Sequence, residues 1–149
     1  MEYLPYWVII TGTVFAVVAS VILHYEGLRF LSDKLPMPSH YHRRRIVLLI
    51  LCLMLLHIIE IWIFGASYYF LQSVPGYGAL NGDSILSIFD CVYYSATVFT
   101  TLGFGDIVPT GPIRFMTGVE AVSGLTFITW SASYTLMEML RTQSAYDVD

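Results

Sequence analysis

Three long apolar runs divide the chain and predict three membrane-spanning helices. The first covers residues 6–23, contains no charged residue and is long enough to cross a bilayer. The second covers residues 46–71 and is interrupted by His57 and Glu60, and the third covers residues 113–140. Because a backbone in lipid must satisfy its hydrogen bonds internally, the β-branched residues of these runs do not argue against helices.

The segments between these runs differ in character. Residues 24–45 are polar, and Pro36 and Pro38 mark a break within them. Residues 72–84 contain glycine, proline, asparagine and aspartate, which indicates a loop. Residues 85–100 are mixed and aromatic, and they are too short and too polar to form a further span.

The basic residues set the expected orientation. Five of the seven lie in the segment after the first run: Arg29, Lys34, Arg43, Arg44 and Arg45. Because basic loops stay in the cytoplasm, we expect the N-terminus outside, residues 72–112 facing outside and the C-terminus in the cytoplasm. Arg43, Arg44 and Arg45 are also candidates to bind anionic lipid head groups, although we favour a role in topology alone.

Composition places the chain among membrane proteins. Of its 149 residues, 56% are hydrophobic and 12% are charged, and the length leaves room for one domain. Cys52 and Cys91 lie in apolar surroundings, without the spacing of a disulfide framework or a metal site. We expect a multi-pass protein of the cell membrane (plasma or inner) that has no cofactor and no nucleic-acid partner.

Residues 99–109, FTTLGFGDIVP, contain two glycines at alternate positions within this apolar chain. Residues 84–112 predict a re-entrant loop, in which a short helix over 85–100 enters the membrane from outside and TLGFGD returns. Non-helical backbone at membrane depth must be buried in protein or line a wet cavity. Gly103 and Gly105 permit backbone angles that are closed to other residues, so successive carbonyls can point one way and replace the hydration shell of a cation.

The hexapeptide Thr101-Leu102-Gly103-Phe104-Gly105-Asp106 resembles the selectivity filter of the potassium channel family at all six positions. The resemblance extends over roughly residues 46–140 and leaves the first run outside. It implies that K⁺ is held, as a permeant ion, by the backbone carbonyls of Thr101, Leu102, Gly103 and Phe104 and by the Thr101 hydroxyl.

The resemblance also implies roles for the residues that support the filter. We expect Phe104 to pack against the helix aromatics Tyr93 and Tyr94, and Gly105 and Asp106 to hold the outer end. Some relatives place a glutamate opposite this aspartate, and here we expect Thr97 at that position. Phe104 replaces the commoner tyrosine and Leu102 the usual valine, which places filter rigidity and gating in question more than ion preference.

One such loop cannot enclose a pore, and the resemblance implies four copies around an axis, so we expect a homotetramer. The expected fold is an all-α membrane protein with three transmembrane helices, a re-entrant pore helix and a filter loop. Residues 1–45 form an N-terminal helix with a basic loop. Residues 46–149 form a pore domain with outer helix 46–71, pore helix 85–100, filter 101–106 and inner helix 113–140.

Ionisable residues and glycines within the runs have two interpretations each. His57 and Glu60 are spaced to form a pair, and with Glu120 they form either a proton-sensitive gating network or hydrogen-bonded tethers between helices. We favour the tethers. Gly124 is either a hinge of the inner helix or a point of close helix packing. Glu138 and Arg141 are expected to form a local pair.

The expected function is passive, K⁺-selective conduction, with no enzymatic activity. A weakly selective cation channel and a nonconducting regulatory subunit are the alternatives within membrane proteins. A membrane enzyme using His57 and Glu60 is a rival of another class, supported by only two polar groups.

Overall fold

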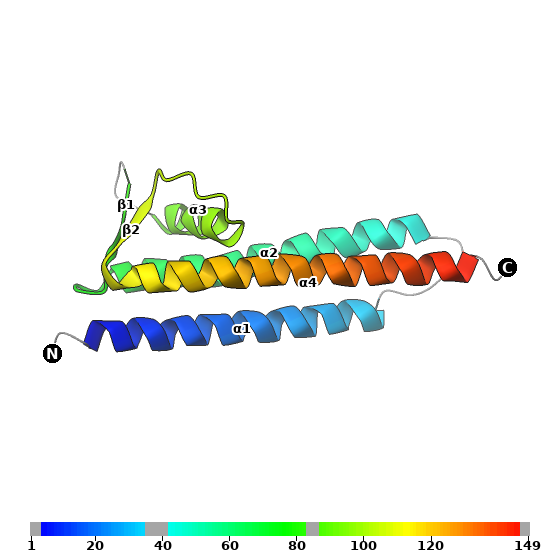
Figure 1. Ribbon diagram of the computed structural model, residues 1–149, viewed down its shortest axis with the longest axis horizontal. Coiled ribbons are helices and arrows are strands. Elements are labelled where there is room, and N and C mark those ends of the chain that lie inside the picture. Colours follow the sequence, from blue (N-terminus) through cyan, green and yellow to red (C-terminus); the bar gives the residue numbers. More distant parts are fainter. Residues whose placement is uncertain (1–3, 35–41, 83–86, 147–149) are drawn as a thin grey trace.

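The computed structural model describes residues 4–34, 42–82 and 87–146. Three long helices, α1 (Leu4–Lys34), α2 (His42–Gln72) and α4 (Arg114–Tyr146), lie side by side along the long axis (Figure 1). The short helix α3 (Ile88–Phe99) and the strands β1 (Ala79–Asn81) and β2 (Val108–Thr110) gather at the end of the bundle that holds the N-terminus. A single 3₁₀ turn, Gly111–Ile113, leads into α4.

Two of the long helices are apolar enough to cross a membrane, over Tyr6–Lys34 and Arg44–Gln72. Only 22% of the most apolar window of each is buried within the chain. The core helix of a soluble protein would bury most of such a window, so these exposed surfaces fit a lipid environment. α4 has 33 residues but is more polar, with serine, threonine and glutamate along its length.

Helix α1 is longer than its apolar run. The sequence predicted a polar segment after residue 23, whereas the helix continues to Lys34. Glu26 and Arg29 are good helix formers and lie three residues apart on an exposed face, with their charged atoms 3.8 Å apart. Hydropathy therefore marked the part of the helix suited to lipid and not its end. Pro36 and Pro38 lie outside the described residues.

A small sheet corrects the all-α expectation. β1 and β2 pair antiparallel, with Ala79 opposite Thr110 and Asn81 opposite Val108. The two backbone segments approach closely at Gly78, where an added Cβ atom would lie 2.1 Å from the Thr110 carbonyl oxygen. The sheet joins the loop that follows α2 to the segment that precedes α4.

Helix α3 begins at a capping box. The Ser87 hydroxyl accepts a hydrogen bond from the Asp90 backbone N–H, and the Asp90 carboxylate accepts one from the Ser87 N–H at 2.7 Å. These bonds to Ser87 lower the pKa of the Asp90 carboxyl. The helix therefore begins at Ile88, three residues later than the predicted start.

Two glycines let α3 pack closely against α2 and α4. A Cβ on Gly65 of α2 would lie 2.8 Å from the Val92 Cα, and one on Gly124 of α4 would lie 2.2 Å from the Phe99 carbonyl oxygen. The main buried cluster surrounds this contact and includes Phe64 and Tyr94. At Gly124 the structure shows the close packing that the sequence offered as one of two alternatives.

Candidate functional site

Residues 101–106 leave the end of α3 in an irregular, exposed conformation. The backbone is left-handed at every second residue, with φ of 59° at Thr101, 54° at Gly103 and 82° at Gly105. A positive φ is rare for a β-branched residue such as threonine and costs about 1–3 kcal/mol. Such strain persists where the surrounding structure enforces it, and it concentrates at functional sites.

The last turn of α3 holds this segment in place. The Thr101 N–H donates to the Val98 carbonyl at 2.9 Å. The Thr97 carbonyl accepts both the Leu102 N–H at 2.9 Å and the Gly103 N–H at 3.1 Å. A Cβ added at Gly103 or Gly105 would meet no atom within 4 Å, so the need for glycine comes from the backbone angle and not from crowding within the chain.

Asp106 is tied to α3 by Tyr93, which corrects the expected partner. The Tyr93 hydroxyl donates to Asp106 Oδ2 at 2.7 Å, and this bond raises the pKa of the tyrosine. The Thr97 hydroxyl instead donates to the Tyr94 carbonyl at 2.8 Å. Tyr93 and Thr97 are four residues apart and share a helix face, but only the long tyrosine side chain reaches the outer end of the segment.

Tyr94 and Phe104 lie in different surroundings within one chain. The Tyr94 ring meets Tyr68 edge-on in the core, with ring centroids 5.1 Å apart, and its hydroxyl bonds the Thr117 hydroxyl at 2.9 Å. Phe104 is 65% exposed and Leu102 is 59% exposed. Within one chain, the apolar side chains of this segment are therefore largely uncovered.

Glu120 joins three helices by hydrogen bonds. It is fully buried on α4 and accepts from the Tyr68 hydroxyl of α2 at 2.5 Å and from the Ser95 hydroxyl of α3. The Ser95 hydroxyl also lies 2.9 Å from the Ile61 carbonyl oxygen of α2. This arrangement matches the interpretation of Glu120 as a tether between helices.

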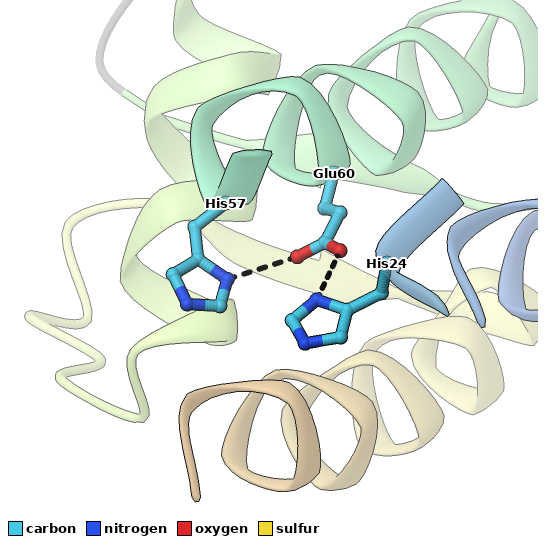
Figure 2. Close-up of side chains that lie close together, drawn as sticks. All are labelled: His24, His57 and Glu60. Carbon is cyan, nitrogen blue, oxygen red and sulfur yellow. Dashed lines mark hydrogen bonds and ion pairs between the residues drawn. The ribbon is translucent and has the colours of Figure 1, made fainter. Parts of the chain in front are cut away.

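Glu60 joins two histidines from different helices (Figure 2). The predicted pair forms, with His57 Nδ1 2.9 Å from Glu60 Oε2. The sequence analysis missed the third member, His24 of α1, whose Nδ1 lies 2.8 Å from Glu60 Oε1. The His57 ring also lies 5.8 Å from the ring of Phe99, two residues before Thr101.

The predicted pair of Glu138 and Arg141 is present, at 3.0 Å, but it belongs to a larger group. Glu138 is buried and also binds Arg45 at 2.5 Å. The Arg45 side chain is only 8% exposed, and its guanidinium pairs with Glu138. Within this chain it is therefore not presented to lipid head groups, which was one of the two roles considered for Arg45. The side chain of Arg43 lies outside the described residues, and Arg44 is exposed.

Comparisons with known proteins bear on the same segment. A family model described as "Ion channel" matches residues 56–141, which include α3, the segment 101–106 and most of α4. A protein of Aeropyrum pernix named "Voltage-gated potassium channel" is 32% identical over an alignment of 62 residues, which covers 39% of this chain. The match covers 21% of that relative, about a fifth of its length. No solved structure matches the chain.

Proposed function

The chain belongs to the ion channel family, and from this premise we propose that it conducts K⁺ selectively as a homotetramer in the cell membrane. The family match spans 58% of the chain's 149 residues, from within α2 to near the end of α4. The potassium channel from Aeropyrum pernix adds support for K⁺ as the ion. An ion channel works by passive passage, so the proposal involves no covalent chemistry.

The observation that carries the proposal is the backbone of residues 101–106. Left-handed angles at Thr101, Gly103 and Gly105 alternate with the intervening residues. Such alternation allows successive carbonyls to face one side, where a ring of them replaces the water around K⁺. In the proposed site the carbonyls of Thr101, Leu102, Gly103 and Phe104 and the Thr101 hydroxyl hold the ion, while Gly105, Asp106, Tyr93 and Thr97 support it.

A tetramer supplies what a single copy lacks. The segment is exposed in one chain, yet irregular backbone at membrane depth must be enclosed by protein. Four copies around an axis enclose a pore and cover Leu102 and Phe104. In this assembly the C-terminus of α3, which carries the negative end of the helix dipole, faces the ion path.

The proposed topology has three spans, α1, α2 and α4. The N-terminus and the strand-bearing loops lie at one end of the bundle and the C-terminus at the other (Figure 1). We place the first end outside and the C-terminus in the cytoplasm, beside Arg44 and Arg45. Residues 1–45 then add a helix to a pore domain of residues 46–149, which consists of outer helix, pore helix, filter and inner helix.

A flux assay tests conduction. Purified protein is placed in liposomes loaded with K⁺, and efflux is followed after dilution into buffer with an impermeant cation. We expect wild-type chain to release K⁺ and Gly105→Ala to abolish release, because alanine is strained at a φ of 82°. Gly118→Ala, which adds a methyl group with no atom within 4 Å, should release K⁺ as the wild type does. If wild type and Gly118→Ala both elute as folded oligomers and release no K⁺, the result would favour a nonconducting subunit.

A further inference from the structure

Three metal-ligating side chains meet in the bundle outside the segment 101–106. His24 comes from α1, and His57 and Glu60 come from α2 (Figure 2). One ligand atom from each lies within 4.8 Å of the others. His24 and Glu60 are fully buried, and His57 is 18% exposed. The family match begins at residue 56, so His24 lies outside it.

The donor set suits a transition metal. Two imidazoles and one carboxylate form one of the three-ligand sets of zinc sites, with a fourth position left for water. Zinc–nitrogen and zinc–oxygen distances are about 2.0–2.2 Å, so ligand atoms on one tetrahedral ion lie roughly 3.3 Å apart. Glu60 Oε1 is 2.8 Å from His24 Nδ1, and Oε2 is 2.9 Å from His57 Nδ1. Each oxygen and its facing nitrogen would move apart by a few tenths of an ångström around an ion, and all three ligand atoms already lie within 4.8 Å of one another.

The surroundings hold the His24 ring in a ligating orientation. Its Nδ1 faces the Glu60 carboxylate, while its Nε2 lies 3.5 Å from the Ser131 hydroxyl of α4. The ring stacks on Phe127 and leans on Trp130, each with a centroid separation of 5.0 Å. Metal-bound histidines characteristically direct the second ring nitrogen to a polar partner that fixes the tautomer.

Charge also favours a cation at this position. The Glu60 carboxylate is fully buried and is met by two imidazoles, which are neutral when they act as metal ligands. A buried carboxylate is costly unless positive charge compensates it. A divalent ion between the three side chains supplies that charge, and the partly exposed edge of His57 offers a route of entry.

We propose that His24, His57 and Glu60 bind a divalent transition-metal ion, with Zn²⁺ as the best-suited ion, and that the ion fastens α1 to the pore domain. The bound ion would fix His57, whose ring contacts Phe99 just before the segment 101–106. Occupancy would therefore stiffen the link between α1 and the end of α3. This inference does not depend on which ion the pore conducts.

Direct metal binding tests the proposal. Full-length protein carrying an affinity tag without histidine is purified in detergent, treated with chelator, equilibrated with Zn²⁺ and passed over a sizing column. We expect one zinc per chain by elemental analysis. Titration with Co²⁺ should give the visible absorption of a tetrahedral site with nitrogen and oxygen ligands, without the intense bands of thiolate ligation.

Variants separate this site from adventitious binding. Ser131→Ala leaves all three ligands and should weaken binding by about tenfold. His24→Gln and His57→Gln each remove a ligand and should weaken it further. The control is the double variant His40→Gln/His42→Gln, which removes the other two histidines of the chain and should leave one zinc per chain.

Two outcomes would overturn the proposal. One is a wild-type protein that elutes without stoichiometric zinc and gives no Co²⁺ spectrum. The other is zinc binding that survives in His24→Gln but disappears in the His40/His42 double variant. If His24→Gln does not elute as a single species, the wild-type stoichiometry and Ser131→Ala decide the question.

Discussion

The Tyr93 hydroxyl donates a hydrogen bond of 2.7 Å to the Asp106 carboxylate, which fastens the outer end of the segment 101–106 to the middle of α3. The Thr97 carbonyl fastens the inner end of the same segment through the Leu102 and Gly103 N–H groups. α3 therefore holds both ends of the proposed filter by hydrogen bonds.

Loss of the Tyr93 hydroxyl should loosen the filter. The bond lies at an exposed position, where water partly replaces a lost partner, so its removal should weaken the proposed filter without unfolding it. We expect Tyr93→Phe to lower the single-channel open probability several-fold. Tyr94→Phe is the control, because its hydroxyl bonds Thr117 and not Asp106. Equal open probabilities in Tyr93→Phe and wild type would refute the role of this bond.

Glu120 should be required for the packing of α3. Glu120→Ala removes the carboxylate that accepts from the Tyr68 and Ser95 hydroxyls, while Ser95 keeps the Ile61 carbonyl as an acceptor, and the loss should cost about 1–3 kcal/mol in stability. We expect a lower thermal unfolding midpoint in detergent, with partial recovery in Glu120→Gln. Thr126→Ala on the same helix removes a hydroxyl that bonds only its own helix at Val122, and it should unfold near the wild-type temperature. A Glu120→Ala protein as stable as Thr126→Ala would contradict the tether.

Gly124 and Gly118 form a matched pair on α4. A methyl group at Gly124 would meet the Phe99 carbonyl oxygen at 2.2 Å, and this backbone atom cannot move without shifting the end of α3. Overpacking of this kind costs about 1–3 kcal/mol, so Gly124→Ala should lower the unfolding midpoint and impair K⁺ flux. Gly118→Ala should be neutral or slightly stabilising, since alanine favours helix. Full flux and stability in Gly124→Ala would show that α3 does not pack as described.

The buried pair of Arg45 and Glu138 should contribute more to folding stability than the exposed pair of Glu26 and Arg29. Removal of one partner of a buried pair costs about 3–5 kcal/mol, and the remaining bond of Glu138 to Arg141 should hold the loss near about 3 kcal/mol. We expect Arg45→Leu to destabilise strongly and the double variant Arg45→Leu/Glu138→Leu to be milder. Arg29→Ala, in a pair at 3.8 Å, should change stability by less than about 1 kcal/mol. Equal losses in Arg45→Leu and Arg29→Ala, measured by thermal unfolding, would reject this ranking.

The positions of the helices followed from hydropathy and from local signals. Long apolar runs located α1 and α2, because lipid leaves a spanning chain no alternative to helix. The motif at residues 101–106 located the segment after α3. Hydropathy did not find the end of α1 at Lys34, because helix propensity and not apolar character extends it beyond the run.

The pattern of apolar and polar residues could not predict contacts between residues far apart in the sequence. The spacing of His57 and Glu60 predicted a pair within one helix, whereas His24 joins them only because α1 and α2 pack in one particular register. The choice of Tyr93 over Thr97 as partner of Asp106 likewise depends on how far α3 extends beside the returning chain. The strands have three residues each and one contains Pro109, so no alternation of apolar and polar positions marked them.

The central claim is that residues 101–106 select K⁺, and the reversal potential tests it most directly. Purified protein is recorded in a planar bilayer with K⁺ on one side and an equal concentration of Na⁺ on the other. We predict a reversal potential far from zero with the K⁺ compartment negative, which is the sign that holds K⁺ back in its own compartment, and no current from Gly105→Ala. A robust wild-type current that reverses near zero would contradict K⁺ selectivity and leave a weakly selective cation channel.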